Sequence, residues 1–210
     1  MKSLEPTQIV KLEKEVFITD EQYHQMMEFV DKRRNDTAYY GWARNGGSKE
    51  KMVDDITIGV LSEFITYNGF IEMGFNFVSP PDLIYTPIKE KVWKPDLVVA
   101  EDNYVLKNLH VKGSRGFKDH KTWTFQLGNE TGTRGCDPIL LIPEIDQNNY
   151  VSLVHITGYK TGIIMAYGQW HILKKYLKDP ILADKKGIKI CLYYPFENMV
   201  TPKSLDKTPV

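Results

Sequence analysis

One stretch, residues 93–113, constrains the fold of this chain more than any other. It reads Trp-Lys-Pro-Asp-Leu-Val-Val-Ala, then Glu-Asp-Asn, then a return run that ends at Gly113. β-Branched residues occur in both runs, and the acidic and amide residues between them suit a turn, so we predict a hairpin of two strands. Side chains alternate across a strand, so Asp96 lies on one face, and His110 and Lys112 share a face of the return strand. If these polar faces coincide, a carboxylate, an imidazole and an ammonium group converge on one side of a sheet.

Length and composition favour a single α/β domain. The chain has 210 residues, of which 42% are hydrophobic, which is enough to bury a core. We expect one domain with a helical and loop extension at 1–50, a core at 51–160, and a helix and strand at 161–210.

Charge and cysteine content restrict the classes of function. Lys+Arg and Asp+Glu both number 27, so the formal net charge is zero, whereas a whole-surface nucleic-acid binder is usually basic. Any affinity for DNA must therefore come from local basic patches. The two cysteines, Cys136 and Cys191, have no metal-site spacing, and we interpret them as reduced thiols. No apolar run approaches the length of a membrane span and the first residues lack a signal-peptide stretch, so we expect a cytoplasmic protein without membrane contact.

Periodicity predicts the other helices and strands. Thr19 and Gln22 have the spacing of a capping box, which predicts a helix over 20–34. A short helix or strand is expected at 9–17 within an N-terminal arm. Residues 123–127 fit a strand, an irregular segment or a helix. The remaining predictions are helices at 52–68 and 167–178, and strands at 70–78, 137–143, 150–156 and 188–194.

Glu63 is the acidic residue of most interest on the predicted helix over 52–68. It lies at the margin of the apolar stripe, one turn after Gly59, so its side chain can reach inward past a small residue. A glutamate on a helix is usually no more than a solvated surface group, and both interpretations stay open.

Basic residues gather in two loops. Arg44 lies in a loop over 35–50 that also carries tyrosine and tryptophan, a mixture that can meet a phosphate backbone or simply pack the loop down. Arg115, Lys118 and Lys121 follow the hairpin in a loop with two glycines. This loop is either a phosphate contact or a solvated turn.

The pair Pro95-Asp96 followed by His110-Val111-Lys112 resembles the core motif of the PD-(D/E)xK nuclease superfamily. The resemblance implies a restriction-endonuclease-like α/β (α+β) fold, in which a mixed central sheet is flanked by helices. It further implies that Asp96 and an additional acidic residue, Glu63, bind Mg²⁺ or Mn²⁺, and that Lys112 assists the attacking water. Related nucleases often carry a polar residue in the element after the lysine, which makes Gln126 a candidate. The chain departs from the motif at His110, where the superfamily has Asp or Glu; this imidazole can bind a metal, act as a base or form a hydrogen bond.

Three functions remain open. The resemblance favours a metal-dependent DNA endonuclease, of a restriction-like or phage and mobile-element kind, with DNA as its partner and a homodimer as a common state of such enzymes. The second is a catalytically degenerate relative that binds DNA or a protein partner, and the third is an unrelated α/β scaffold. A viral origin would place the protein in the host-cell cytoplasm. Spacings for zinc sites, phosphate-binding loops and α/β-hydrolases are absent from the sequence.

Overall fold

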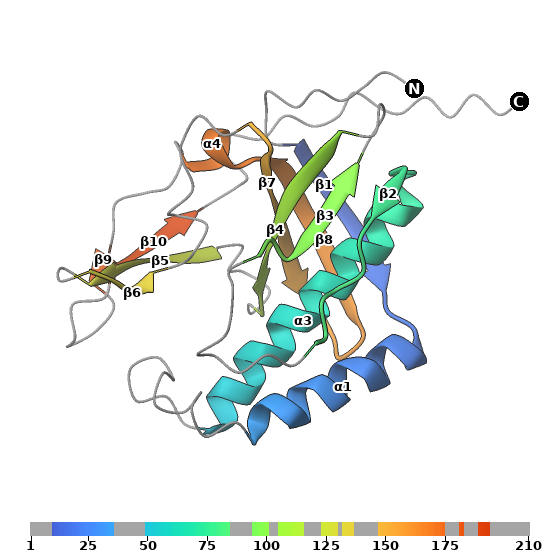
Figure 1. Ribbon diagram of the computed structural model, residues 1–210, viewed down its shortest axis with the longest axis horizontal. Coiled ribbons are helices and arrows are strands. Elements are labelled where there is room, and N and C mark those ends of the chain that lie inside the picture. The colour runs from blue at the N-terminus through green and yellow to red at the C-terminus, as the bar shows by residue number, and fades with distance from the viewer. Residues whose placement is uncertain are drawn as a thin grey trace, which may run out of the picture.

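The computed structural model describes residues 10–35, 49–84, 94–100, 105–115, 123–129, 132–136, 147–174, 181–182 and 189–193. Two helices cover one face of a mixed sheet, and a smaller sheet lies beside it (Figure 1). The helices are α1 (Asp20–Arg34), α3 (Lys49–Glu72) and α4 (Trp170–Leu173). The strands are β1 (Val10–Phe17), β2 (Phe77–Val78), β3 (Leu97–Ala100), β4 (Leu106–Ser114), β5 (Trp123–Asn129), β6 (Gly132–Cys136), β7 (Asn149–Ile156), β8 (Thr161–Gln169), β9 (Ile181–Leu182) and β10 (Lys189–Tyr193). The expected α/β class with a mixed sheet flanked by helices is confirmed at this level.

The larger sheet has six strands in the order β1-β8-β7-β4-β3-β2. Strands β4 and β7 are parallel, and the other described pairings in this sheet are antiparallel. The predicted hairpin over 93–113 is present as β3 and β4. Of the two alternatives for residues 9–17 in the N-terminal arm, the strand is confirmed: it is β1, which pairs with β8. The sheet thus draws on all three of the segments into which we divided the sequence.

Helices α1 and α3 pack against each other and bury one face of the six-stranded sheet (Figure 1). The predicted capping box begins α1: the Thr19 hydroxyl accepts from the Gln22 amide at 3.1 Å, and the Gln22 side chain accepts from the Thr19 amide at 2.9 Å. The core beneath the helices contains Leu97, Leu109 and Val154 from the sheet. This packing fixes which face of β3 and β4 is apolar.

Helix α3 is longer than the sequence predicted. We expected it to end at Asn68 and Gly69, and we expected a strand over 70–78. The helix instead continues to Glu72, because Asn68 donates to the Phe17 carbonyl at 2.8 Å and Phe70 is fully buried against other aromatic rings. Gly74 ends this segment in a left-handed conformation with φ of 83°, which leaves only Phe77–Val78 as strand.

The helix predicted over 167–178 starts too early, because residues 167–169 are strand and the helix begins at Trp170. Residues up to Gln169 belong to β8, which is paired on both sides, with β7 and with β1. Only Trp170–Leu173 is helical, and residues 175–178 lie outside the described part of the chain. Pairing with two neighbouring strands has overridden the local helical pattern.

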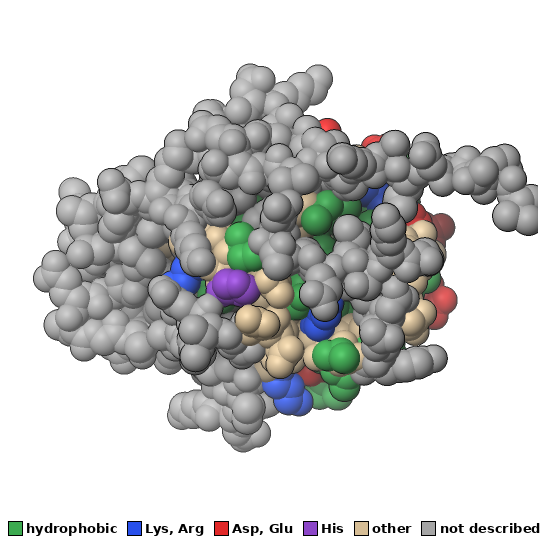
Figure 2. Space-filling model, turned by 90° about the horizontal axis from the view of Figure 1, so that it is seen from above, with side chains coloured by type: hydrophobic (Ala, Val, Ile, Leu, Met, Phe, Trp, Pro, Cys, Tyr) green, Lys and Arg blue, Asp and Glu red, His purple; other side chains and the backbone are tan. Residues whose placement is uncertain are grey.

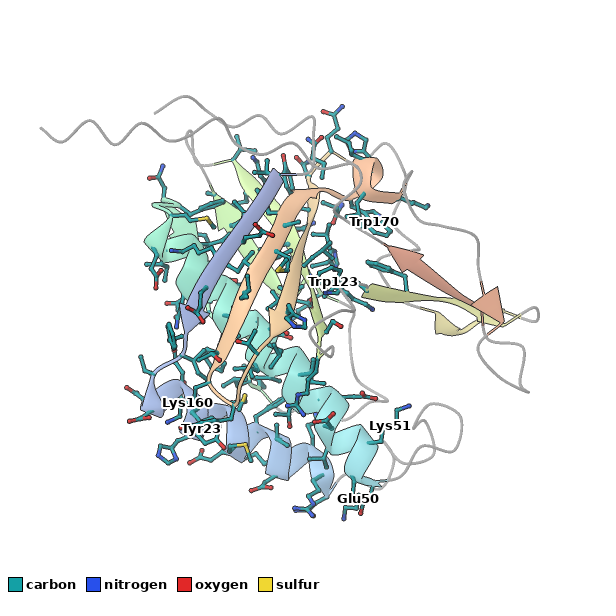
Figure 3. The ribbon with its side chains drawn as sticks, turned by 180° about the vertical axis from the view of Figure 1, so that it is seen from behind. Tyr23, Glu50, Lys51, Trp123, Lys160 and Trp170 are labelled. Carbon is teal, nitrogen blue, oxygen red and sulfur yellow. The ribbon has the colours of Figure 1, made fainter. Side chains whose placement is uncertain are left out.

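The smaller sheet has the order β6-β5-β10-β9. A strand was one of three alternatives for 123–127, and it is confirmed, as is the strand predicted over 188–194. The strand expected at 137–143 lies outside the described residues. Trp123 and Phe125 of β5 pack with Leu153 of β7 and Trp170 of α4 in a second apolar cluster. Figure 3 shows Trp123 and Trp170 where the two sheets meet. This cluster covers the face of the larger sheet opposite α3.

The turn between β7 and β8 is attached to the start of α1 through Lys160. Its ammonium group lies 5.0 Å from the ring centroid of Tyr23 and forms an ion pair with Asp20 (Figure 3). The hydrogen bond from Lys160 holds the pKa of Asp20 below its ordinary value, and the same bond raises the pKa of Lys160. No helix within the described ranges is long and apolar enough to cross a membrane.

Candidate active site on strands β3 and β4

The structure brings Asp96 to the middle of β4. Strands β3 and β4 are antiparallel with Leu97 opposite Leu109, so one further step in this register places Asp96 opposite His110. The Asp96 carboxylate is half-buried, and its Oδ2 accepts a hydrogen bond from the Val111 amide at 2.7 Å. An acceptor bonded to a backbone amide has a fixed position. Asp96 is therefore held beside the two residues that flank Val111.

Lys112 lies on the face of β4 that is turned away from α3. Leu109 and Val111 pack into the core beneath α3, so the residues that alternate with them face the other side. The Lys112 ammonium lies 5.0 Å from the ring centroid of Phe125, which belongs to the cluster on that other side. His110 shares this face by alternation and is half-buried. The predicted grouping of His110 and Lys112 on one face thus agrees with the packing.

Glu63 comes from a different layer. It is half-buried on α3, which covers the Leu109 and Val111 face of the sheet. Its neighbour Ser62 lies so close to β4 that a Cβ added to Gly113 would be 2.2 Å from the Ser62 hydroxyl. Within the described ranges, no three His, Cys, Asp or Glu side chains form a group that could hold a metal ion. The predicted ligand set of Glu63, Asp96 and His110 is therefore not gathered as a three-residue cluster, and Asp96 with His110 is the part that the register brings together.

Of the four basic residues predicted to contact nucleic acid, the structure describes Arg115 alone. Arg115 at the end of β4 forms an ion pair with Asp54 of α3, and both side chains are about half exposed, at 46% and 47%. Arg44, Lys118 and Lys121 lie outside the described residues. Gln126 lies within β5, where the backbone but not the side chain is described. Arg115 already has an acidic partner, so a phosphate would have to compete with Asp54 for it.

Described side chains of both charges lie on the face of the molecule shown in Figure 2. In Figure 2 basic, acidic and apolar side chains are interspersed over the described part of the face seen there, with a histidine among them. This distribution agrees with the formal net charge of zero.

Sequence reasoning overlooked Phe125 as part of the site. Trp123, Phe125 and Leu127 alternate with threonine and glutamine, which as a strand would give one apolar face, but a helix and an irregular segment were equally open. Nothing in that pattern says that the face would meet Lys112, because β5 belongs to the other sheet. The signal for burial was present, but the partner was not predictable from spacing.

No protein-family model matches the chain, and searches of curated proteins and of solved structures give no significant match.

Proposed function

We propose that the protein is a metal-dependent DNA endonuclease with its catalytic groups on β3 and β4. One observation supports this most: the Asp96 carboxylate accepts a hydrogen bond at 2.7 Å from the amide of Val111, the residue that directly precedes Lys112 in β4. An acid and an amine at neighbouring positions are what phosphodiester hydrolysis requires of the protein when a divalent ion is present. The proposal gives Glu63 no direct role.

The donor groups at this site suit a hard or borderline divalent ion. Mg²⁺ commonly binds proteins through one or two carboxylates and keeps several waters, so Asp96 alone is a sufficient anchor. His110, opposite Asp96 in the register, offers a nitrogen ligand that suits Mn²⁺ better than Mg²⁺. When bound, such an ion supplies a water of lowered pKa and neutralises charge on the phosphate.

Asp96 and Lys112 would divide the remaining work. The hydrogen bond from Val111 orients the Asp96 carboxylate before any ligand arrives, which reduces the entropy lost on binding. Lys112 is half-buried, and its ammonium would donate to a phosphate oxygen as negative charge develops there. His110 would hydrogen-bond the same phosphate or act as a ligand.

A degenerate nuclease that binds DNA or a protein partner is the alternative function. It is favoured by the lack of a three-residue ligand group within the described ranges and by the ion pair of Arg115 with Asp54. The two functions differ in a measurable way, because the alternative predicts binding without cleavage.

The experiment is cleavage of supercoiled plasmid and of linear and single-stranded DNA with Mg²⁺ or Mn²⁺. We expect metal-dependent cleavage that falls by at least about 100-fold in Asp96→Asn and in Lys112→Gln, the effect usual for loss of one group that stabilises developing charge. Lys107→Gln is the matched control, because it removes another lysine of β4. The Lys107 ammonium lies 4.7 Å from the ring centroid of Tyr150, a residue of the core beneath α3 and not of the cluster around Phe125. The activity of this variant should match that of wild type. Intact DNA in every combination of substrate and metal would refute the endonuclease and favour the alternative.

A further inference from the structure

Lys112 reaches across to a residue of the smaller sheet. Its ammonium lies 5.0 Å from the centroid of the Phe125 ring, within the range of a cation–π contact. Phe125 comes from β5, which pairs with β6 and β10 and not with the strand that carries Lys112. The proposed catalytic amine on β4 is therefore in contact with β5, a strand of the other sheet.

The Phe125 ring is firmly held. It is fully buried, and the Trp170 ring packs against it with centroids 5.5 Å apart. Trp123, two residues earlier on β5, donates from its indole nitrogen to the Val154 carbonyl at 3.1 Å, which attaches β5 to the larger sheet. Because aromatic rings in such a cluster have little freedom, Phe125 presents a fixed surface to Lys112.

Such a surface favours the lysine rotamers that keep the ammonium in one place. The four-carbon stem of lysine has many rotamers, and each unproductive rotamer moves the ammonium away from the reacting phosphate. A ring face attracts the cation electrostatically without donating or accepting a proton. The ring can therefore orient the ammonium without competing for its proton.

We propose that Phe125 is a positioning residue that holds the Lys112 ammonium in its working place, so that docking of the smaller sheet completes the active site. This inference rests on the proposed endonuclease function. It assigns the smaller sheet a role in catalysis beyond covering the larger one.

The first test replaces Phe125 by phenylalanines that carry increasing numbers of fluorine atoms. Fluorine draws electron density from the ring face and weakens cation–π attraction while the ring stays nearly the same size. With each added fluorine, kcat for DNA cleavage should fall, by roughly two- to thirtyfold in total, with KM and the melting temperature little changed. Wild-type cleavage that is unaffected by fluorination would overturn the role of Phe125 and leave the endonuclease intact. No cleavage by wild type would overturn both.

The second test does not depend on activity. In protein with ¹³C-labelled lysine, the ring current of Phe125 should shift the Lys112 Hε signals upfield, and Lys112→Gln identifies them by their loss. Phe125→Leu should return these signals to ordinary positions. Trp170→Phe, which changes the same cluster without removing the ring next to Lys112, should keep the shift. Ordinary Lys112 signals in the wild-type protein would contradict the contact itself.

Discussion

Asp96 illustrates how one side chain can serve both the fold and the chemistry. Its carboxylate satisfies the backbone amide of Val111 at the point where β3 has not yet begun to pair, and the same group is the proposed metal ligand. The alternation of residues in the sequence predicted the shared face of His110 and Lys112. It did not predict the Val111 bond, since a side chain that bonds a backbone group of the neighbouring strand leaves no periodic signal.

The two tasks of Asp96 can be separated by substitution. Asp96→Asn keeps an acceptor oxygen for the Val111 amide, whereas Asp96→Ala leaves this part-buried donor without the carboxylate. We predict that Asp96→Ala lowers the free energy of unfolding by about 1–3 kcal/mol and that Asp96→Asn lowers it by less than about 1 kcal/mol. Urea denaturation measures both. Equal stabilities for the two variants would show that the bond contributes nothing to the fold, even if both variants are inactive.

Helix α3 packs closely against the sheet at positions where the sheet has glycine. Gly113 of β4 and Gly162 of β8 both lie where the helix approaches the sheet closely; an added Cβ at Gly162 would be 2.5 Å from Ile65. Local pattern predicted the existence of α3 but missed its end by several residues. Its extension is stabilised by contacts with β1, such as that of Asn68 with Phe17, which are distant in sequence. Glu63 was assigned to the site through the nuclease resemblance; helical spacing gives its angle around the helix but not the layer to which the helix belongs.

Gly113 provides a test of this close approach. A Cβ at this position would be 2.2 Å from the Ser62 hydroxyl and 3.1 Å from the Ile58 carbonyl, so Gly113→Ala should destabilise the protein by about 1–3 kcal/mol. Adding Ser62→Ala removes the nearest atom and should restore part of the loss. A double-mutant cycle by thermal or urea unfolding gives the coupling between the two positions. Additive effects would mean that α3 and β4 are not in direct contact there.

For the chain as a whole, the sequence predicted the α/β class and the central hairpin but not the way distant segments join. Residues 10–17 pair with 161–169, and residues 123–129 pair with 189–193 in a separate sheet. Such pairings depend on complementary surfaces that form only when the intervening chain has folded, so no local periodicity reports them. Lys112 of the larger sheet thus contacts Phe125 of the smaller sheet, and only the larger sheet was predicted from the sequence.

Mn²⁺ titration followed through backbone amide signals tests the central claim most directly, namely that Asp96 anchors a divalent ion beside Lys112. Paramagnetic Mn²⁺ broadens the signals of nearby amides, and we expect selective loss at residues 96 and 110–112 in the wild-type protein. In Asp96→Asn the same signals should persist at equal Mn²⁺ concentration. Broadening that is absent from β3 and β4, or that is unchanged in Asp96→Asn, would contradict the account.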